Sequence, residues 1–331
     1  MAECGDRNGD GYIEYSGKTD QETPVNQGWK DSEDGIVRED GSFPEPPISL
    51  VEVQGYAYLA KTAIADLYCR AGEQTTGARL IREAEELRDR FNRDFWMQDK
   101  GCYCLALEAD GRPVSVITSN AGQALWTGIA DADKAHRTAQ RLMQDDMFSG
   151  WGVRTLSDQE VRYNPFAYQL GSIWPFDNSL ILAGFRRYGL DDFACRILKC
   201  TLEAAKRFPL SRLPEFFAGT RREEDFSPAH CPRADPLQAW SAGAVPFMLS
   251  ELLGLQPQGF DQTLRIVRPV LPASIDHLEL HGIRVGAASA NLRFVRESSG
   301  AIVPQVLSVQ GALKVELESS AFGKRGQNNQ D

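Results

Sequence analysis

The sequence predicts a mainly α protein, built as a toroid of helical hairpins with a small β region at its C-terminal end. Two patterns carry this prediction. Segments that are apolar on most faces alternate with segments that have a single apolar stripe, which is typical of inner and outer helices in two layers. After residue 258 the apolar spacing changes to two, which is typical of strands. The predicted parts are a helical domain over 1–258, a β region over 259–322 and a disordered tail over 323–331.

The helical part contains three predicted hairpins and one further helix. In each hairpin an apolar segment precedes an amphipathic one, and Gly-rich loops join them. The hairpins are 48–69 with 79–96, 120–130 with 133–143, and 178–187 with 192–208, and the further helix is 236–253. The strands expected after them cover 264–267, 278–280, 292–295 and 313–317. Such a layout points to inner helices around a central pocket.

The first apolar segment has polar residues near its beginning, namely Glu52, Gln54 and Tyr56. A helix that is apolar on all faces is buried, so polar residues clustered at one end of it are expected to face a cavity.

Composition narrows the classes of function. Of the 331 residues, 42% are hydrophobic, which is enough for a real core. The formal net charge of −10, without clustered Lys and Arg, argues against nucleic acid and suits a neutral, hydroxyl-rich ligand. There is no charged-then-apolar leader and no apolar run of about 18 residues, so we expect a cytoplasmic protein without membrane contact.

Cysteines and histidines give no sign of a metal or a cofactor. Seven cysteines are an odd number without a paired framework, which indicates reduced thiols. Cys102 and Cys104 are separated by one residue, whereas a zinc pair has two between them. The four histidines form no metal-binding pattern, so carboxylates are expected to carry any acid-base chemistry.

One stretch near the N-terminus, Asp6-Arg-Asn8-Gly-Asp10-Gly11, reproduces the first half of a calcium loop. The twelfth position of such a loop is a bidentate Glu, and here it is Gly17. Calcium binding and a plain acidic turn both stay open.

The stretch Asn26-Gln-Gly-Trp-Lys-Asp-Ser-Glu-Asp34 sets two carboxylates, Asp31 and Asp34, beside Trp29. A carboxyl group beside an indole suits sugar cleavage, because it offers a proton donor and a flat apolar surface for a pyranose. The alternative is a helix-capping cluster, since Asp and Ser favour helix ends and turns.

Later loops add aromatic, basic and acidic residues beside the predicted inner helices. These are Trp151, Arg154, Tyr168, Gln169, Trp174, Asp177, Glu215 and Trp240. Taken singly, each Trp is explained by core packing. Their joint placement beside carboxylates favours a cavity wall.

Six motifs combine these residues. They are Gln27-Gly-Trp-Lys-Asp-Ser-Glu-Asp34, Glu52-Val-Gln-Gly-Tyr56, Gly150-Trp-Gly-Val-Arg-Thr155, Tyr168-Gln-Leu-Gly-Ser-Ile-Trp-Pro-Phe-Asp-Asn178, Leu213-Pro-Glu215 and Gln238-Ala-Trp240. In this order the stretch from about Asn26 to Leu255 resembles the amylo-α-1,6-glucosidase family, the glucosidase module of glycogen debranching proteins. That family is related to the mannosylglycerate-hydrolase-like glycosidases.

The resemblance implies an (α/α)6 toroid of the six-hairpin glycosidase type and inverting hydrolysis of an α-glucosidic bond. It places the general acid on Asp31 and the general base on Glu215, with Asp34 and Asp177 binding sugar hydroxyls. The other residues expected to bind substrate are Trp29, Lys30, Glu52, Gln54, Tyr56, Trp151, Arg154, Tyr168, Gln169, Trp174, Gln238 and Trp240. An inverting site needs carboxyl groups roughly 6.5–9.5 Å apart, which two acids on distant loops can provide.

The chain also departs from the family. Gln169 and Phe176 stand where relatives often carry His. About seven of the twelve helices of a toroid are present, and the family's first five helices and its N-terminal β domain are missing. Such an incomplete toroid would expose apolar faces, which implies a partner that supplies the missing N-terminal half, or self-association.

Other functions stay open at this point. One is an inactive, carbohydrate-binding remnant. Another is a related glycosidase that acts on glucosylglycerate or mannosylglycerate. A sugar epimerase or lyase ranks last, because such enzymes usually need catalytic histidines and the four here lie outside the motifs.

Overall fold

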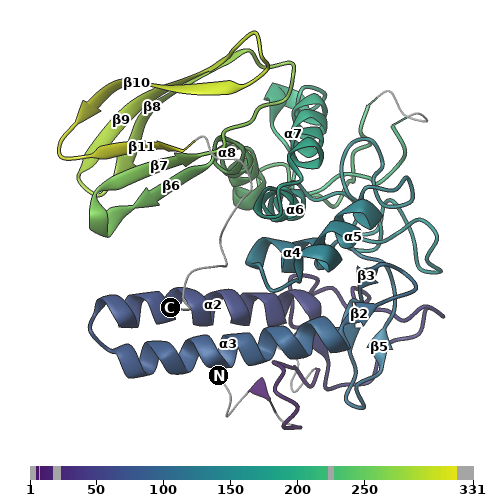
Figure 1. The fold of residues 1–331 in the computed structure, drawn as a ribbon. Helices are drawn as coiled ribbons and strands as arrows, with labels where there is room; N and C mark the ends of the chain where they lie inside the picture. The colour runs from purple at the N-terminus through teal and green to yellow at the C-terminus, as the bar shows by residue number, and fades with distance from the viewer. Residues whose placement is uncertain (1–4, 7, 18–23, 223–226, 319–331) are drawn as a thin grey trace.

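The computed structural model describes residues 5, 6, 8–17, 24–222 and 227–318. All of the long helices precede residue 254, and the longer strands follow it (Figure 1). The predicted mainly helical structure with small sheets is confirmed. The predicted tail over 323–331 lies outside the described residues.

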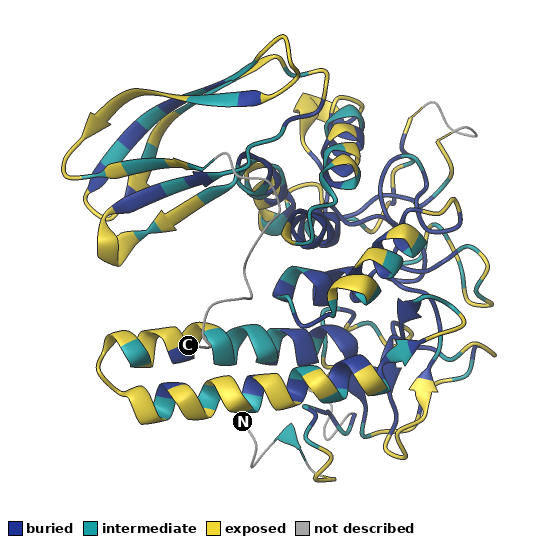
Figure 2. Cartoon of the chain, in the orientation of Figure 1, coloured by how far each residue is buried: buried dark blue, intermediate teal, exposed yellow. Residues whose placement is uncertain are grey.

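The first hairpin consists of α2 (Val51–Arg70) and α3 (Gln74–Asp94), which lie side by side (Figure 1). The amphipathic pattern of α3 is confirmed, since Ala84, Leu87 and Phe91 are buried. The expectation that the preceding helix is buried on all faces is wrong for its second half. There Ile64 and Leu67 are 43% and 49% exposed, because α3 and α4 pack against other faces of α2 (Figure 2).

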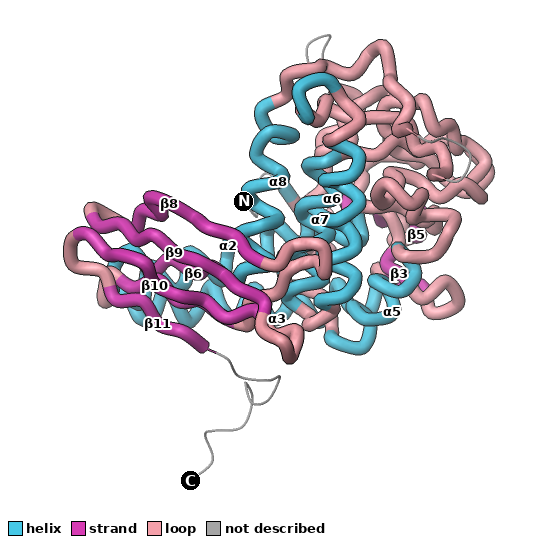
Figure 3. Tube along the Cα trace, turned by 90° about the horizontal axis from the view of Figure 1, so that it is seen from above, coloured by secondary structure: helices cyan, strands magenta, loops and turns pink. Residues whose placement is uncertain are grey.

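The remaining helices continue the two-layer arrangement. They are α4 (Asn120–Thr127), α5 (Ala132–Leu142), α6 (Pro175–Arg187), α7 (Asp191–Ala205) and α8 (Ala239–Leu253). In space α2, α4, α6 and α8 follow one another as neighbours (Figure 1). Helix α3 packs on α2, α5 on α4, and α7 on both α6 and α8 (Figure 3 shows α7 beside α6 and α8). Helix α6 begins before its predicted start because a proline is well placed in a first helical turn, where the missing N–H is not needed.

The main hydrophobic core lies between these helices. Leu87, Phe91, Leu125, Ile181 and Met248 are fully or almost fully buried in it and come from α3, α4, α6 and α8. The core therefore joins residues as far apart in the sequence as Leu87 and Met248 and holds the loops at the helix ends in place.

Two three-stranded sheets make up the C-terminal β region. One has the order β10-β9-β8 and is antiparallel; its strands are β8 (His277–Val285), β9 (Ala288–Arg296) and β10 (Ile302–Gln310). The other has the order β11-β7-β6, with β11 parallel to β7; its strands are β6 (Leu255–Gln258), β7 (Thr263–Val267) and β11 (Lys314–Glu318).

The period-two prediction succeeds where one strand face is buried. Along β9, Ala288, Ala290, Leu292 and Phe294 are buried and alternate with partly exposed residues. Strands β6 and β10 were not predicted. Strand β10 is mostly exposed and contains Pro304, so its sequence lacks an apolar-polar alternation.

Short strands brace the loops near the helix ends. Strands β1 (Ser49–Leu50), β4 (Ala106–Leu107) and β5 (Pro113–Val114) form one small sheet, and β2 (Trp96–Met97) pairs with β3 (Cys102–Tyr103). Within the described residues, no helix combines the length and the apolar character needed to span a bilayer.

Candidate functional site

The predicted acid, Asp31, lies in the loop before β1 and α2, where its side chain is exposed. A buried side chain from another loop, Gln169, holds this loop. Its Oε1 accepts hydrogen bonds from the backbone N–H (3.1 Å) and the hydroxyl (2.8 Å) of Ser32. Its Nε2 donates to the carbonyl of Trp29 (3.0 Å) and to Oδ1 of Asp31 (3.4 Å). The acid loop is thus fixed at three points along Trp29 to Ser32.

The predicted base, Glu215, is 7% exposed and each of its carboxylate oxygens accepts a hydrogen bond. The hydroxyl of Tyr168 donates to Oε1 at 2.8 Å, and the backbone N–H of Asp235 donates to Oε2 at 3.2 Å. Ser241 donates to the carbonyl oxygen of Glu215 at 3.2 Å from the start of α8. Both the side chain and the backbone of Glu215 are therefore held.

Tyr168 contacts Glu215 and is also influenced by the charge of Asp31. The negative charges of both residues act on Tyr168, and together with burial, the largest cause, they raise the pKa of its phenol well above its usual range. The base loop is joined to the loop that carries Tyr168 by reciprocal backbone hydrogen bonds between Ile173 and Phe217. The pairing of Asp31 and Glu215 as acid and base stays a prediction.

Six aromatic side chains form a continuous cluster around these carboxylates, here called the aromatic cluster. Trp174 stacks on Phe216 with ring centroids 5.1 Å apart. Phe176 stacks on Trp240 at 4.4 Å, and Trp29 meets Trp174 edge-on at 5.6 Å. The members are Trp29, Tyr168, Trp174, Phe176, Phe216 and Trp240. Trp29 and Trp240 stay partly exposed, so their ring faces can receive the apolar face of a sugar.

A group of buried polar residues continues from this cluster, and Lys30 is its cation. The Lys30 side chain is fully buried; its Nζ donates to the carbonyl of Thr155 at 2.6 Å and lies 5.5 Å from the ring centroid of Trp29. Burial lowers the pKa of Lys30 to about 8, although the negative charges of Asp177 and Glu52 oppose this shift.

Two carboxylates accompany Lys30, and both are fully buried. Burial raises the pKa of Glu52 to about 6, and the neighbouring Asn120 amide and the charge of Lys30 only partly offset this shift. Burial also raises the pKa of Asp177, whose Oδ1 accepts a hydrogen bond from Gln123 at 2.6 Å. The amide oxygen of Gln123 in turn accepts from the hydroxyl of Tyr56. These five residues are here called the buried polar cluster.

Several polar atoms of this region have no hydrogen-bond partner among the described residues. They include both carboxylate oxygens of Glu52 and Oδ2 of Asp177. Buried polar atoms normally have a hydrogen-bond partner, so an atom without one needs an explanation. Oxygen acceptors of this kind can bind the hydroxyl groups of a sugar.

Three residues that were expected to bind substrate have side chains that contact other parts of the protein. Two of them, Gln54 and Arg154, use their polar groups in hydrogen bonds to the backbone. The Gln54 amide bonds to the backbone of Ile13 and of Leu50. The Arg154 guanidinium, fully buried, donates to the carbonyls of Gly219 and Asp145.

The third, Trp151, packs in a separate core group with Ile173, Phe208 and Phe217. The geometry therefore gives Gln54, Arg154 and Trp151 structural contacts and no place beside the two carboxylates.

Two further expected residues lie at the edge of the candidate site. Gln238 caps α8, where its Oε1 accepts the N–H of Ala239 at 2.8 Å. Asp34 is exposed in the acid loop.

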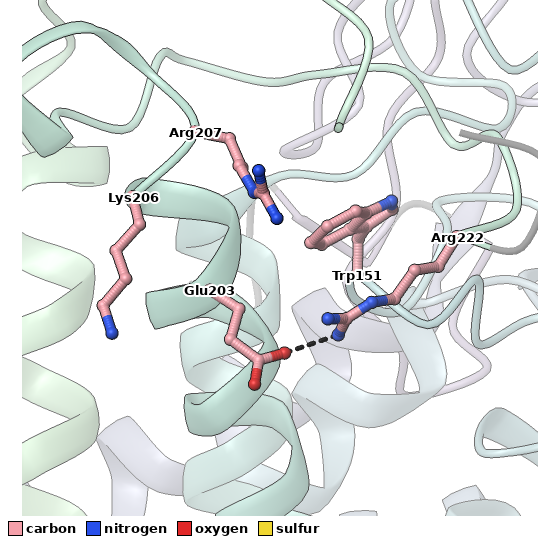
Figure 4. A pocket seen from close by; sticks show the side chains of 5 residues that line it. All are labelled: Trp151, Glu203, Lys206, Arg207 and Arg222. Atoms are coloured by element: carbon pink, nitrogen blue, oxygen red, sulfur yellow. Dashed lines mark hydrogen bonds and ion pairs between the residues drawn. The ribbon is translucent and has the colours of Figure 1, made fainter. Parts of the chain in front are cut away.

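Two cavities of the described residues are lined by residues other than the proposed acid and base. One, of about 360 Å³, is lined by Trp151, Glu203, Lys206, Arg207 and Arg222, and an ion pair joins Glu203 to Arg222 (Figure 4). A second, of about 620 Å³, adjoins it and reaches Leu213 and Ser241. Neither is lined by Asp31 or Glu215, so the hollows do not coincide with the carboxylates.

The sequence reasoning missed Gln123, Phe176 and Phe216 as parts of the site. For Gln123 a signal was present, because residues 119–123 set polar side chains at the start of an apolar helix, as Glu52 does in α2. Phe216 gave no such signal, because a phenylalanine that follows a carboxylate residue is equally common in a hydrophobic core.

The calcium-like stretch forms a turn in which acidic groups bond locally. Asp6 accepts the N–H groups of Gly9 and Gly11 at 2.9 and 3.0 Å. Asp10 accepts the N–H of Tyr12 at 2.8 Å. Among the described residues no group of three or more His, Cys, Asp or Glu side chains is arranged to hold a metal ion.

Solved structures with a similar fold are those of carbohydrate-active enzymes. A sialidase has a TM-score of 0.66 at 15% identity, with 86% of this chain and 27% of that chain covered. A GH78 rhamnosidase of Bacillus sp. GL1 has 0.61 at 16%, with 96% and 29% covered. The GH63 mannosylglycerate hydrolase of Thermus thermophilus, in complex with glucose, has 0.50 at 18%, with 61% and 47% covered.

These likenesses concern the fold, and the chain spans less than half the length of the structures just named. No curated protein matches it. The family model for the mannosylglycerate hydrolase MGH1-like glycoside hydrolase domain matches residues 33–218, which include Glu52, Tyr168, Asp177 and Glu215. The chain therefore belongs to the MGH1-like glycoside hydrolase domain family.

Proposed function

We propose that this chain is a glycosidase module that cleaves an α-glucosidic bond with inversion, as amylo-α-1,6-glucosidases do. Asp31 is the general acid and Glu215 the general base. The observation that carries the proposal is that Tyr168, in the aromatic cluster, donates to Glu215 at 2.8 Å while the adjacent Gln169 donates to Asp31 at 3.4 Å, which connects two loops far apart in the sequence. Inverting hydrolysis requires such a pair of carboxyl groups on opposite sides of a bound sugar.

In this proposal the aromatic cluster receives the sugar ring and the buried polar cluster binds its hydroxyls. Glu215 takes a proton from water, which attacks the anomeric carbon, while Asp31 gives a proton to the leaving oxygen. The hydrogen bonds from Tyr168 and Asp235 hold the Glu215 carboxylate in place for this step. Asp177 and Glu52 offer free oxygens to the hydroxyls.

A second candidate, hydrolysis of mannosylglycerate or glucosylglycerate, is favoured by the family match. Its substrate carries a carboxylate, which needs a cation in the site. Among the residues of the two clusters the cation is Lys30, and its side chain is fully buried against Thr155. This favours a neutral glucoside as the substrate.

The experiment compares sugar release from a branched limit dextrin, short α-glucosides and mannosylglycerate, with the anomer read by NMR. We expect β-glucose from the glucosides and none from the Glu215→Gln variant. Glu297→Gln, an exposed change in the β region, is the matched control. Release of mannose supports the second candidate, whereas oligosaccharide binding without product supports an inactive, carbohydrate-binding remnant.

We also propose that α2, α4, α6 and α8 are inner helices of an incomplete (α/α)6 toroid that further helices complete, in the same polypeptide or in another chain. Two features support this. The flank of α2 exposes Ile64, Leu67 and Tyr68, and α8 has no charged residue before Glu251 although several of its residues are exposed. Sedimentation of the isolated chain should reveal association that Leu67→Lys weakens.

A further inference from the structure

The two proposed catalytic carboxylates are contacted by two consecutive residues. Tyr168 donates to Oε1 of Glu215 at 2.8 Å, and Gln169 donates to Oδ1 of Asp31 at 3.4 Å. One dipeptide therefore connects an acid loop and a base loop that are 184 residues apart in the sequence.

The Gln169 side chain uses all of its hydrogen-bonding capacity on the acid loop. A glutamine amide offers two acceptor sites and two donors, and within the described residues Gln169 makes two bonds of each kind, to Trp29, Asp31 and Ser32. The backbone N–H of Ser32 can only donate and the carbonyl of Trp29 can only accept, so these two partners fix the orientation of the amide.

The Tyr168 side chain is also fixed in place by its contacts, like that of Gln169. Its ring meets Trp174 and Phe216 edge-on at centroid distances of 4.9 and 5.1 Å. Burial, followed by the neighbouring Glu215, raises the pKa of the phenol, so it remains a donor at every physiological pH. Its carbonyl accepts from the hydroxyl of Ser172 (2.6 Å) and the indole N–H of Trp174 (2.9 Å).

We propose that Tyr168 and Gln169 are positioning residues, which together set the place of Asp31 relative to Glu215. This rests on the proposed function of those two carboxylates. It assigns Tyr168 and Gln169 to the protein's own loops, because the Gln169 amide has no bond left for a sugar. Positioning of this kind affects turnover more than binding, since small misplacements of catalytic groups lower the rate of the chemical step.

The first test is a kinetic cycle with Gln169→Leu, Tyr168→Phe and the double variant on the glycoside that the wild type hydrolyses. We expect kcat to fall about 30-fold or more in Gln169→Leu and about 10-fold in Tyr168→Phe, with KM changed less than about threefold. Gln169→His, which keeps one donor and one acceptor, should recover part of kcat. Gln256→Leu, at an exposed position of β6, is the matched control.

The double variant tests whether the two residues act as one unit. For a shared unit the combined loss of kcat is smaller than the product of the single losses, because either change already frees one loop from the other. Losses that multiply, or a raised KM with unchanged kcat, would overturn the proposal.

The second test does not depend on activity. Hydrogen exchange is followed by mass spectrometry in peptides covering 26–35 and 211–217, in the wild type and the same variants. We expect Gln169→Leu to accelerate exchange around Ser32, and Gln256→Leu to leave it unchanged. Unchanged exchange in Gln169→Leu refutes the positioning role whatever the activity. Accelerated exchange in a chain that hydrolyses none of the glycosides retains the loop contact and refutes the proposed function instead.

Discussion

Glu215 and Glu52 are both buried carboxylates of the helical part, yet their surroundings differ. Glu215 is 7% exposed, and each of its oxygens accepts a hydrogen bond, from Tyr168 and from Asp235. Glu52 is fully buried beside the Asn120 amide, and within the described residues neither of its oxygens accepts a hydrogen bond of normal geometry. Burial raises the pKa of Glu52 to about 6, and the Asn120 amide and the charge of Lys30 only partly offset this shift.

The difference separates two uses of an acid. Donors that point at both oxygens fix the direction of a carboxylate, as a proton acceptor requires. A carboxylate whose oxygens accept no hydrogen bond from the protein is stabilised most by a ligand that donates hydrogen bonds to it from hydroxyl groups. The aromatic cluster with Glu215 is thus suited to chemistry, and the buried polar cluster to recognition.

The largest expected effect concerns Asp31, the proposed partner of Glu215. Asp31→Asn removes the proton that the leaving group needs, so hydrolysis should fall about 1,000-fold. The free energy of unfolding should change by less than about 1 kcal/mol, because the side chain is exposed and its bond to Gln169 is long at 3.4 Å. Initial rates and urea unfolding measure the two quantities. Turnover equal to the wild type would place the acid elsewhere.

The next effect concerns the cation of the buried polar cluster. Lys30→Met removes the positive charge that lies near the buried carboxylates of Glu52 and Asp177, so the free energy of unfolding should fall by about 3 kcal/mol. Urea unfolding at pH 7 measures this, and Lys206→Met, at the exposed end of α7, is the control. A loss similar to that of the control would show that Lys30 does not stabilise the two acids.

A smaller effect should depend on pH. Because the pKa of Glu52 is raised from its ordinary value of 4.5 to about 6, the folded state binds a proton more readily than the unfolded state. Stability from this group is complete below pH 4.5 and is lost as the pH rises through about 6. Glu52→Gln should therefore gain about 2 kcal/mol at pH 8 and nothing at pH 4.

Unfolding by urea at the two pH values measures this gain. Glu215→Gln, which replaces a carboxylate held by two hydrogen bonds, should show no gain at either pH. A gain in both variants would remove the distinction between the two acids.

The smallest effect concerns the backbone of the base loop. Ser241→Ala removes the hydroxyl that donates to the carbonyl of Glu215 at 3.2 Å. We expect a loss of about 1 kcal/mol in stability and a fall in kcat of less than about threefold. A fall as large as that of Tyr168→Phe would make the backbone contact as important as the side-chain contact.

Local patterns in the sequence predicted the long helices and four of the six described strands of the C-terminal β region, because each depends on residues close together in the chain. The apolar stripe of α3 and the alternation along β9 are examples, and burial confirms both. Strand β10 was not predicted, because its sequence lacks an apolar-polar alternation and contains Pro304. The motifs likewise indicated a glycoside hydrolase, and the match over residues 33–218 agrees.

Residue identity alone could not separate contacts made with a ligand from contacts made with the chain. By residue type, five polar side chains were equally good candidates for binding substrate, namely Gln54, Arg154, Gln169, Glu52 and Asp177. In the fold, the first three direct their polar groups to backbone or loop partners, whereas Glu52 and Asp177 keep free oxygens.

The sequence by itself predicted the order of the long helices and of four C-terminal strands, a glycoside hydrolase, and the two acids proposed for catalysis. Only the tertiary structure decided which side chains meet, such as Tyr168 with Glu215 and Gln169 with Asp31. The reason is physical. Periodicity reports which face of an element is buried, whereas a hydrogen bond between loops depends on how distant elements pack.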